Sequence, residues 1–226
     1  MPSPSSRTAL LAGATGLIGS HILQALLADP GVAKVHVLAR RPLTASDPKL
    51  QVDVVDFKRL PALQAIDETY LALGTTIRVA GSQEAFRAVD LDANLAVAKA
   101  AAAAGCQRVG LVSAVGASAR SSVFYNRVKG ELEDALKAMN LAALVIAQPS
   151  LLMGDRKALN QPSRFGEEFA TPLMKLLSPI LPRSFRPVEG RSVAQSLVRT
   201  LPTAQGLVVL SSDELSRLGA DQGPRT

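Results

Sequence analysis

Two residues of this sequence, Tyr125 and Lys129, have the types and the spacing that proton transfer requires. Both lie in the stretch SSVFYNRVKGELEDAL, residues 121–136, which we predict to be helical. Four residues along a helix bring two side chains to one face, so the phenol and the ammonium would be neighbours. An ammonium favours the phenolate form of a nearby phenol, which could then donate a proton to a carbonyl or take one from an alcohol. The same spacing also fits an ordinary pair on a helix surface. The elements around residues 121–136 decide between these two interpretations.

Seven short apolar runs predict the strands that would position this pair. The runs are continuously apolar rather than alternating, as expected for parallel strands covered by helices on both faces. Helical patterns separate them as far as residue 149, which predicts an α/β fold with a doubly wound, Rossmann-like parallel sheet of about seven strands. The runs are TALLA, AKVHVLAR, LQVDVVDF, ETYLALGTT, RVGLVSAVG, LAALVIAQP and GLVVLSS.

The chain of 226 residues is long enough for one domain with an ample core. We predict a single domain over residues 1–226, with a dinucleotide-binding core at 8–149 and a small substrate-side extension at 150–226. Residues 82–104 and 122–139 predict the two helices nearest the fifth strand. The extension is rich in proline and irregular, as segments that cover the ligand crevice often are. Its stretch RFGEEFATPLMKLLSPIL predicts a helix that could close the pocket or form an oligomer contact.

A glycine turn, GATGLIG, lies between the first strand and the first helix. A pyrophosphate binds backbone N–H groups at a helix N-terminus, where the helix dipole favours negative charge, and a side chain in the turn would block its approach. The last glycine lets the helix lie close to the sheet. A turn without a ligand is the simpler alternative. We expect a dinucleotide to contact Gly13, Thr15, Gly16, Leu17, Ile18 and Gly19.

The end of the second strand indicates which dinucleotide would bind. NAD-binding proteins usually carry an acid there, which binds the ribose 2′-hydroxyl. This chain instead has Ala39, Arg40 and Arg41. Because an arginine can pair with a 2′-phosphate, we favour NADP(H), with Arg40 as the first contact and Arg41 as the second. If both arginines are solvated loop charges, NAD(H) remains open.

Together the glycine turn and the Tyr-x-x-x-Lys spacing resemble the short-chain dehydrogenase/reductase superfamily, in its extended and atypical branches. LGTT, VDLDANLAVAKAAAAAGCQRVGLVSAVGA and SSVFYNRVKGELE look like one atypical branch. That branch comprises small NADP-binding oxidoreductases similar to the Tat-interacting protein family. The resemblance runs from about residue 8 to about residue 200 and implies NADP(H) binding, without fixing a substrate.

The same resemblance implies roles for residues around the pair. Lys129 would also hold the ribose hydroxyls of the cofactor. Ser113 would bind the substrate oxygen. Because Ala114 stands where some relatives have a second serine, Ser118 and Ser121 are alternatives to Ser113.

Cofactor contacts elsewhere also follow from the resemblance. The end of the third strand would border the adenine, and the end of the fourth would lie near the ribose. After the sixth strand, larger relatives often have Arg-Pro-Gly, whereas here Gln148 replaces the arginine and the proline is kept. Asp90 and Asn94 match the family's relay asparagine poorly, so we expect them on a helix surface. The contacts implied are Asp56, Phe57, Leu73, Gly74, Thr75 and Pro149.

Three functions compete at this point. The first is an NADP(H)-dependent oxidoreductase that acts on a small carbonyl or alcohol through Tyr125 and Lys129. The second is a regulatory protein that binds NADPH, senses its redox state and has little turnover. A nucleotide-sugar epimerase or dehydratase fits less well, because such relatives usually have a larger substrate region than residues 150–226.

Composition limits the partners and the compartment. The net charge is +6, but the basic residues are scattered and aromatic residues make up 4%, so we expect no nucleic-acid partner. No apolar run could cross a bilayer, and MPSPSSRT has no signal-type segment, so we expect a cytoplasmic protein without a membrane partner. One cysteine and two separated histidines give no reason to expect a metal. The expected partner is an unidentified small molecule, and a homo-oligomer or a protein partner stays open.

Overall fold

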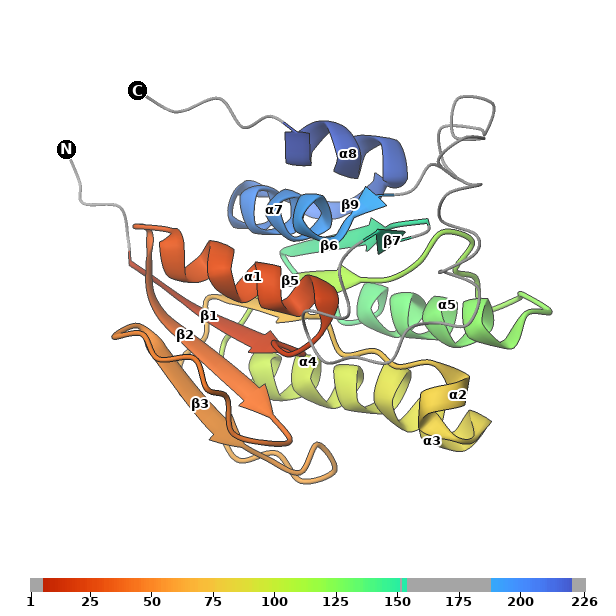
Figure 1. Ribbon diagram of the computed structural model, residues 1–226, viewed down its shortest axis with the longest axis horizontal. Helices are drawn as coiled ribbons and strands as arrows, with labels where there is room; N and C mark the ends of the chain where they lie inside the picture. Colours follow the sequence, from red (N-terminus) through yellow and green to blue (C-terminus); the bar gives the residue numbers. More distant parts are fainter. Residues whose placement is uncertain (1–5, 151, 154–187, 221–226) are drawn as a thin grey trace.

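Seven parallel strands form the main sheet of the computed structural model, which describes residues 6–150, 152–153 and 188–220 (Figure 1). The strand order is β3-β2-β1-β4-β5-β6-β9, which confirms the predicted fold class and the number of strands. A separate parallel pair joins two short strands, β7 (Leu152–Met153) and β8 (Val188–Glu189). The strands of the sheet are β1 (Arg7–Ala12), β2 (Val32–Ala39), β3 (Leu50–Val54), β4 (Glu68–Leu71), β5 (Arg108–Val112), β6 (Ala143–Gln148) and β9 (Gly206–Ser211).

Helices cover both faces of this sheet (Figure 1). The helices α1 and α7 pack side by side on one face, with α8 against α7, while α4 and α5 cover the other face. Among the described helices, none is long and apolar enough to cross a bilayer. The helices are α1 (Leu17–Ala28), α2 (Ile77–Ala80), α3 (Gln83–Arg87), a π-helical segment (Ala88–Ala93), α4 (Asn94–Ala103), α5 (Phe124–Lys137), α7 (Gly190–Thr200), a 3-10 turn (Leu201–Thr203) and α8 (Ser212–Ala220).

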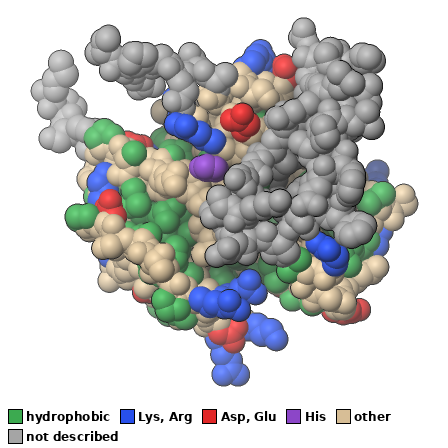
Figure 2. Space-filling view, in the orientation of Figure 1, with side chains coloured by type: hydrophobic (Ala, Val, Ile, Leu, Met, Phe, Trp, Pro, Cys, Tyr) green, Lys and Arg blue, Asp and Glu red, His purple; other side chains and the backbone are tan. Residues whose placement is uncertain are grey.

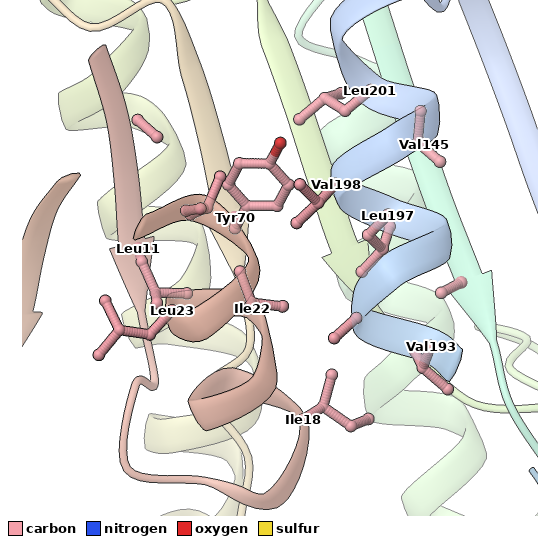
Figure 3. Packing of buried hydrophobic residues seen from close by; sticks show 14 of the residues in the cluster. Leu11, Ile18, Ile22, Leu23, Tyr70, Val145, Val193, Leu197, Val198 and Leu201 are labelled. Carbon is pink, nitrogen blue, oxygen red and sulfur yellow. The ribbon is translucent and has the colours of Figure 1, made fainter. Parts of the chain in front are cut away.

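The sheet separates two hydrophobic cores. On one face, Tyr70 points from β4 to the space between α1 and α7, where it meets Ile22 and Val198 (Figure 3). On the other face, Leu111 of β5 packs with Leu132 of α5. Because the central strands are buried on both faces, their apolar runs are continuous, as the sequence indicated.

The strand order reverses between β1 and β4, which are neighbours in the sheet. In doubly wound folds, ligands bind outside the carboxyl ends of the strands at such a reversal. The turn after β1 and the segment after β4 both lie at this edge. The fold therefore places the predicted glycine turn and the stretch LGTT at the expected crevice.

Several predicted boundaries are corrected by the structure. The third and fourth strands are shorter than predicted, since β3 ends at Val54 and β4 at Leu71. Asp56 lies in a turn beyond β3, in which its carboxylate accepts the N–H of Lys58. The expected helix over 82–104 exists, but a π-helical segment interrupts it. The helix expected for RFGEEFATPLMKLLSPIL lies outside the described residues.

A partly buried cluster of charged side chains lies at the amino end of β4. Arg7 Nη1 lies 2.7 Å from Glu68 Oε2, and Arg7 Nη2 lies 2.6 Å from Asp29 Oδ2. Glu68 is only 1% exposed, and this burial raises its pKa, although Arg7 opposes the shift. The folded protein therefore holds the Glu68 proton more tightly than the unfolded chain does.

We predict that the stability of the wild type relative to Glu68→Gln falls as the pH rises. The extra stability from protonated Glu68 is complete below 4.5, the ordinary Glu pKa, and is lost as the pH passes the raised value. Urea unfolding followed by circular dichroism between pH 4 and about pH 8 measures this difference.

Glu84→Gln is the control, because Glu84 is exposed and its backbone N–H and Ser82 lower its pKa. Its stability difference from the wild type should stay level above about pH 5.5. A difference for Glu68→Gln that does not change with pH would contradict the proposed burial effect.

Candidate functional site

The glycine turn after β1 packs directly against the chain that follows β4. Gly13 has a φ of +99°, and a Cβ there would lie 2.4 Å from the carbonyl of Ala72. A Cβ on Gly19 would lie 1.9 Å from the carbonyl oxygen of Gly13. Both contacts are impossible for any other residue, so this geometry requires glycine at both positions.

The N-terminus of α1 has the features of an anion site. Gly16 is the N-cap, no side chain caps the helix, and the first turn holds no acid. The helix dipole and the first backbone N–H groups therefore favour a negative group at this end. Leu17 and Ile18 are buried and anchor the turn to the core, whereas Thr15 is exposed at its tip. These residues fit a pyrophosphate held by backbone donors.

Basic side chains stand where β2 and β3 end. Arg40 and Arg41 directly follow β2 and are exposed. In the part of the chain that the structure describes, no carboxylate forms an ion pair with either of them. Figure 2 shows Lys and Arg side chains gathered at the lower edge of the molecule, and Lys58 and Arg59 from the loop after β3 are also exposed. This edge can accept a phosphate next to the glycine turn.

Asp56 and Phe57, expected near the adenine, lie in the turn after β3. Asp56 is exposed, whereas Phe57 is half-buried against the core beneath α4 and α5. The N–H of Val55 donates to the carbonyl oxygen of Ala39 at 2.9 Å. This bond keeps the turn beside the end of β2, and so beside Arg40.

The helix α5 contacts the helical run 83–103 at successive turns. The ring of Tyr125 is half-buried, and its centroid lies 5.7 Å from that of Phe86 in α3. One turn later, Lys129 Nζ lies 2.8 Å from Asp90 Oδ1. Both side chains of this ion pair are buried, with 5% and 1% exposed. Tyr125 and Lys129 therefore lie on the same face of α5, as their spacing predicted.

Asp90 and Asn94 are buried, so the expectation of helix-surface positions is wrong. The Thr75 backbone N–H donates to Asp90 Oδ2 at 2.8 Å, and Asn94 Nδ2 donates to the carbonyl oxygen of Leu73 at 3.1 Å. The polar side chains turn inward because Lys129 and the chain after β4 offer them partners. These contacts fix the segment Leu73, Gly74 and Thr75 at the edge of the sheet.

Gly74 lies over the buried ion pair. It is exposed, and a Cβ there would lie 3.5 Å from Asp90 Oδ1 and 3.9 Å from Lys129 Nζ. The buried Oδ1 of Asn94 has no hydrogen-bond partner among the described residues. A buried acceptor of this kind is a place for a water or for a ligand hydroxyl.

Ser113 contacts Glu133, and no hydrogen bond of the described residues joins it to Tyr125. Its hydroxyl donates to Glu133 Oε1 at 2.5 Å, and Gln148 Nε2 donates to the same oxygen at 2.9 Å. Ser113 and Glu133 are both buried. Glu133 lies two helical turns beyond Tyr125, so the structure does not bring the predicted serine to the phenol.

The alternative serines stabilise the loop that leads into α5. Ser118 Oγ accepts the N–H of Arg120, and Ser121 Oγ accepts the N–H of Val123. This loop lies so close to α5 that a Cβ on Gly130 would be 2.1 Å from the Ser118 carbonyl carbon. The buried Pro149 holds the same loop, since its carbonyl oxygen accepts the N–H of Val115 at 3.0 Å.

Sequence reasoning missed the residues that surround the pair. Neither of the motifs recognised in the sequence, the glycine turn and the Tyr-x-x-x-Lys spacing, includes Phe86, Gly130 or Glu133. A glycine within the helical stretch FYNRVKGELE is a usable signal for close packing, since glycine weakens a helix interior. The contacts of Phe86 and Glu133 had no such signal, because they join segments far apart in the chain.

The comparisons with known proteins agree with this geometry. Residues 13–153, from the glycine turn to β7, match the model of a family described as NAD(P)H-binding. The chain belongs to the NAD(P)H-binding family. It is also similar to "Protein fmp52, mitochondrial" of Emericella nidulans, with 35% identity over 178 residues, 74% of this chain and 76% of the relative.

Solved structures share the fold of this NAD(P)H-binding protein. A short chain dehydrogenase family protein from Francisella tularensis has a TM-score of 0.68 at 12% identity, covering 92% of this chain and 98% of its own. "MoeE5 in complex with UDP-glucose and NAD" has a TM-score of 0.66 at 18% identity, covering 94% of this chain and 81% of its own. The chain thus shares a Rossmann-like α/β fold with these structures.

The expectation of a cytoplasmic protein is wrong by the same comparisons. The fmp52 relatives in Emericella nidulans, Candida glabrata and Eremothecium gossypii are all named as mitochondrial proteins, at 35%, 36% and 37% identity. The sequence argument depended on the lack of a signal-type segment before the first strand, and that lack does not specify a compartment.

We predict that Gly19→Ala destabilises the protein and abolishes cofactor binding. The new Cβ would overlap the Gly13 carbonyl oxygen, so the turn must shift, at a cost of about 2 kcal/mol or more. Thermal unfolding and NADPH titration measure the two effects.

Gly74→Ala is the matched control within the same site. Its Cβ would make only ordinary contacts, the nearest at 3.5 Å, so the melting temperature should change little. A Gly19→Ala protein as stable as the wild type would contradict the described turn.

Proposed function

We propose that this protein is an NADP(H)-dependent oxidoreductase that acts on a small carbonyl or alcohol. The observation that supports this most is the buried Lys129 ammonium, which lies under Gly74 at the carboxyl edge of β4 and one helical turn from Tyr125. The glycine turn and the N-terminus of α1 lie at the same edge, where doubly wound folds bind their ligands.

Tyr125 is the proton donor in this proposal. The bound cofactor supplies the hydride. Tyr125 donates its phenolic proton to the carbonyl oxygen as the alcohol forms, and it takes the proton back in the reverse direction. Lys129 stabilises the phenolate that remains and holds the ribose hydroxyls. The ring of Phe86 packs against the ring of Tyr125 at an interplanar angle of 50°, which supports its position.

We favour NADP(H) over NAD(H) for this site. The support is Arg40 at the end of β2, where an acid for the ribose 2′-hydroxyl would otherwise stand. Arg40 is exposed, and no carboxylate of the described residues forms an ion pair with it. A guanidinium pairs with phosphate oxygens through two parallel hydrogen bonds, which gives both affinity and orientation. The second basic side chain, Arg41, adds to the positive potential.

A regulatory role is the second candidate, and the Ser113 contact favours it. In a turnover enzyme of this type, a hydroxyl beside the tyrosine would bind the substrate oxygen. Here the Ser113 hydroxyl donates to Glu133 instead. A protein that binds NADPH and signals its redox state to a partner would not need that hydroxyl.

We predict that Tyr125→Phe abolishes carbonyl-dependent oxidation of NADPH without abolishing NADPH binding. Loss of a general acid should lower the rate by about 10²–10⁴-fold. The measurement is the fall in NADPH absorbance with a panel of aldehydes and ketones, alongside a binding titration.

Ser113→Ala is the comparison variant, because it removes a hydroxyl of the same region. If Tyr125→Phe oxidises NADPH as fast as the wild type, the catalytic proposal fails. If the wild type binds NADPH tightly but turns over no carbonyl, the regulatory candidate is supported.

We predict that Arg40→Ala weakens NADP binding much more than NAD binding. Losing a charge-assisted contact to the 2′-phosphate should cost about 1.5–3 kcal/mol, or roughly 10–150-fold in affinity. Isothermal titration measures how much the variant changes the Kd for NADP and the Kd for NAD relative to the wild type. Lys34→Ala removes a charge from the amino half of β2 and should change neither Kd. Equal losses for NADP and NAD in Arg40→Ala would count against the assignment.

A further inference from the structure

Asp90 forms an ion pair with Lys129. The two side chains are 2.8 Å apart, and Asp90 is 1% exposed. It lies in the π-helical segment between α3 and α4, and π-helical turns occur frequently at functional sites. Its other oxygen accepts the backbone N–H of Thr75, so the carboxylate is held from two sides.

The charge of this pair matters for any nicotinamide bound beside it. The oxidised ring carries a positive charge and the reduced ring is neutral. A lone buried ammonium would repel the oxidised ring and leave the reduced ring unaffected. An adjacent carboxylate cancels most of this repulsion, and the low local dielectric makes such charges effective over several ångströms.

We propose that Asp90 is a positioning residue that offsets the charge of Lys129 and thereby sets the relative affinity of the site for NADP⁺ and NADPH. This inference rests on the proposed function, because it requires the nicotinamide near Tyr125 and Lys129. The negative charge of Asp90 reduces the repulsion between Lys129 and the oxidised ring, so the oxidised cofactor binds with a smaller charge penalty. The protein can then bind both redox forms, as a reversible oxidoreductase or a redox sensor must.

The same residue connects the two sides of the crevice. Asp90 binds Lys129 of α5 through one oxygen and Thr75, after β4, through the other. Asn94, one turn later, holds the carbonyl oxygen of Leu73. A change in the position of Asp90 would therefore move the ammonium and the segment that borders the cofactor together.

The test compares the affinities of NADP⁺ and NADPH in charge variants of the pair. Because the chain has no tryptophan, NADPH fluorescence can be titrated directly, and NADP⁺ is measured by competition. Asp90→Asn keeps the shape and an acceptor for Thr75 but removes the charge. We expect the ratio Kd(NADP⁺)/Kd(NADPH) to rise about tenfold, since Asp90 then no longer offsets the positive charge of Lys129 near the oxidised ring.

Two further variants separate the effect of charge on the affinity ratio from the effect of a structural change. Lys129→Met leaves the carboxylate alone, so the ratio should fall below that of the wild type. The double variant Asp90→Asn/Lys129→Met restores neutrality, so its ratio should return to the wild-type value even if both affinities are lower. If Asp90→Asn fails to fold, Lys129→Met and the double variant still give the comparison.

Glu68→Gln is the matched control, because it removes a carboxylate from a buried ion pair at the opposite end of β4. It should change stability and leave the cofactor ratio unchanged. If the wild type binds both cofactors and the ratio is the same in all variants of the pair, the inference about Asp90 is overturned and the proposed function stands. If the wild type binds neither cofactor, both are overturned.

Discussion

The ion pair between Lys129 and Asp90 is the interaction on which the candidate site depends. It joins α5 to the helical run that covers the same face of the sheet, with both side chains almost fully buried. Removing one partner of a buried pair costs about 3–5 kcal/mol, because the other charge stays without compensation. The pair therefore fixes the register between these helices. Tyr125, one turn earlier, and the chain after β4 take their positions from it.

Charged groups occupy the two ends of β4, whereas its middle residues, Thr69 and Tyr70, are uncharged and buried. Arg7 and Glu68 lie at the amino end, and Asp90 and Lys129 lie beyond the carboxyl end. A parallel strand covered on both faces has no other place for charge. The two ends of β4 differ in one feature that matters for ligand binding. Only the carboxyl end adjoins a glycine turn and an uncapped helix N-terminus, so only this end suits a phosphorylated ligand.

Membership of the NAD(P)H-binding family and the geometry of the crevice lead to the same class of ligand. Family membership and the geometry of the crevice do not support catalysis equally strongly. The tyrosine and the lysine stand together on one face of α5, as turnover would require. The serine expected beside them is bound to Glu133. This difference keeps the enzyme and the regulatory protein as distinct hypotheses, since the first needs a polar group for the substrate oxygen and the second does not.

The sequence by itself determined the sheet, its helices, the glycine turn and the pairing of Tyr125 with Lys129. Each of these follows from local periodicity or from short spacings, which act within one element or one turn. It did not determine the partners of Lys129 and Ser113, or the inward turn of Asp90 and Asn94. Those contacts join residues 15 or more positions apart. Polar residues on a helix usually face water unless a buried partner stands opposite. Only the tertiary structure brings that partner into place, because the packing of α5 against the π-helical segment decides which charges meet.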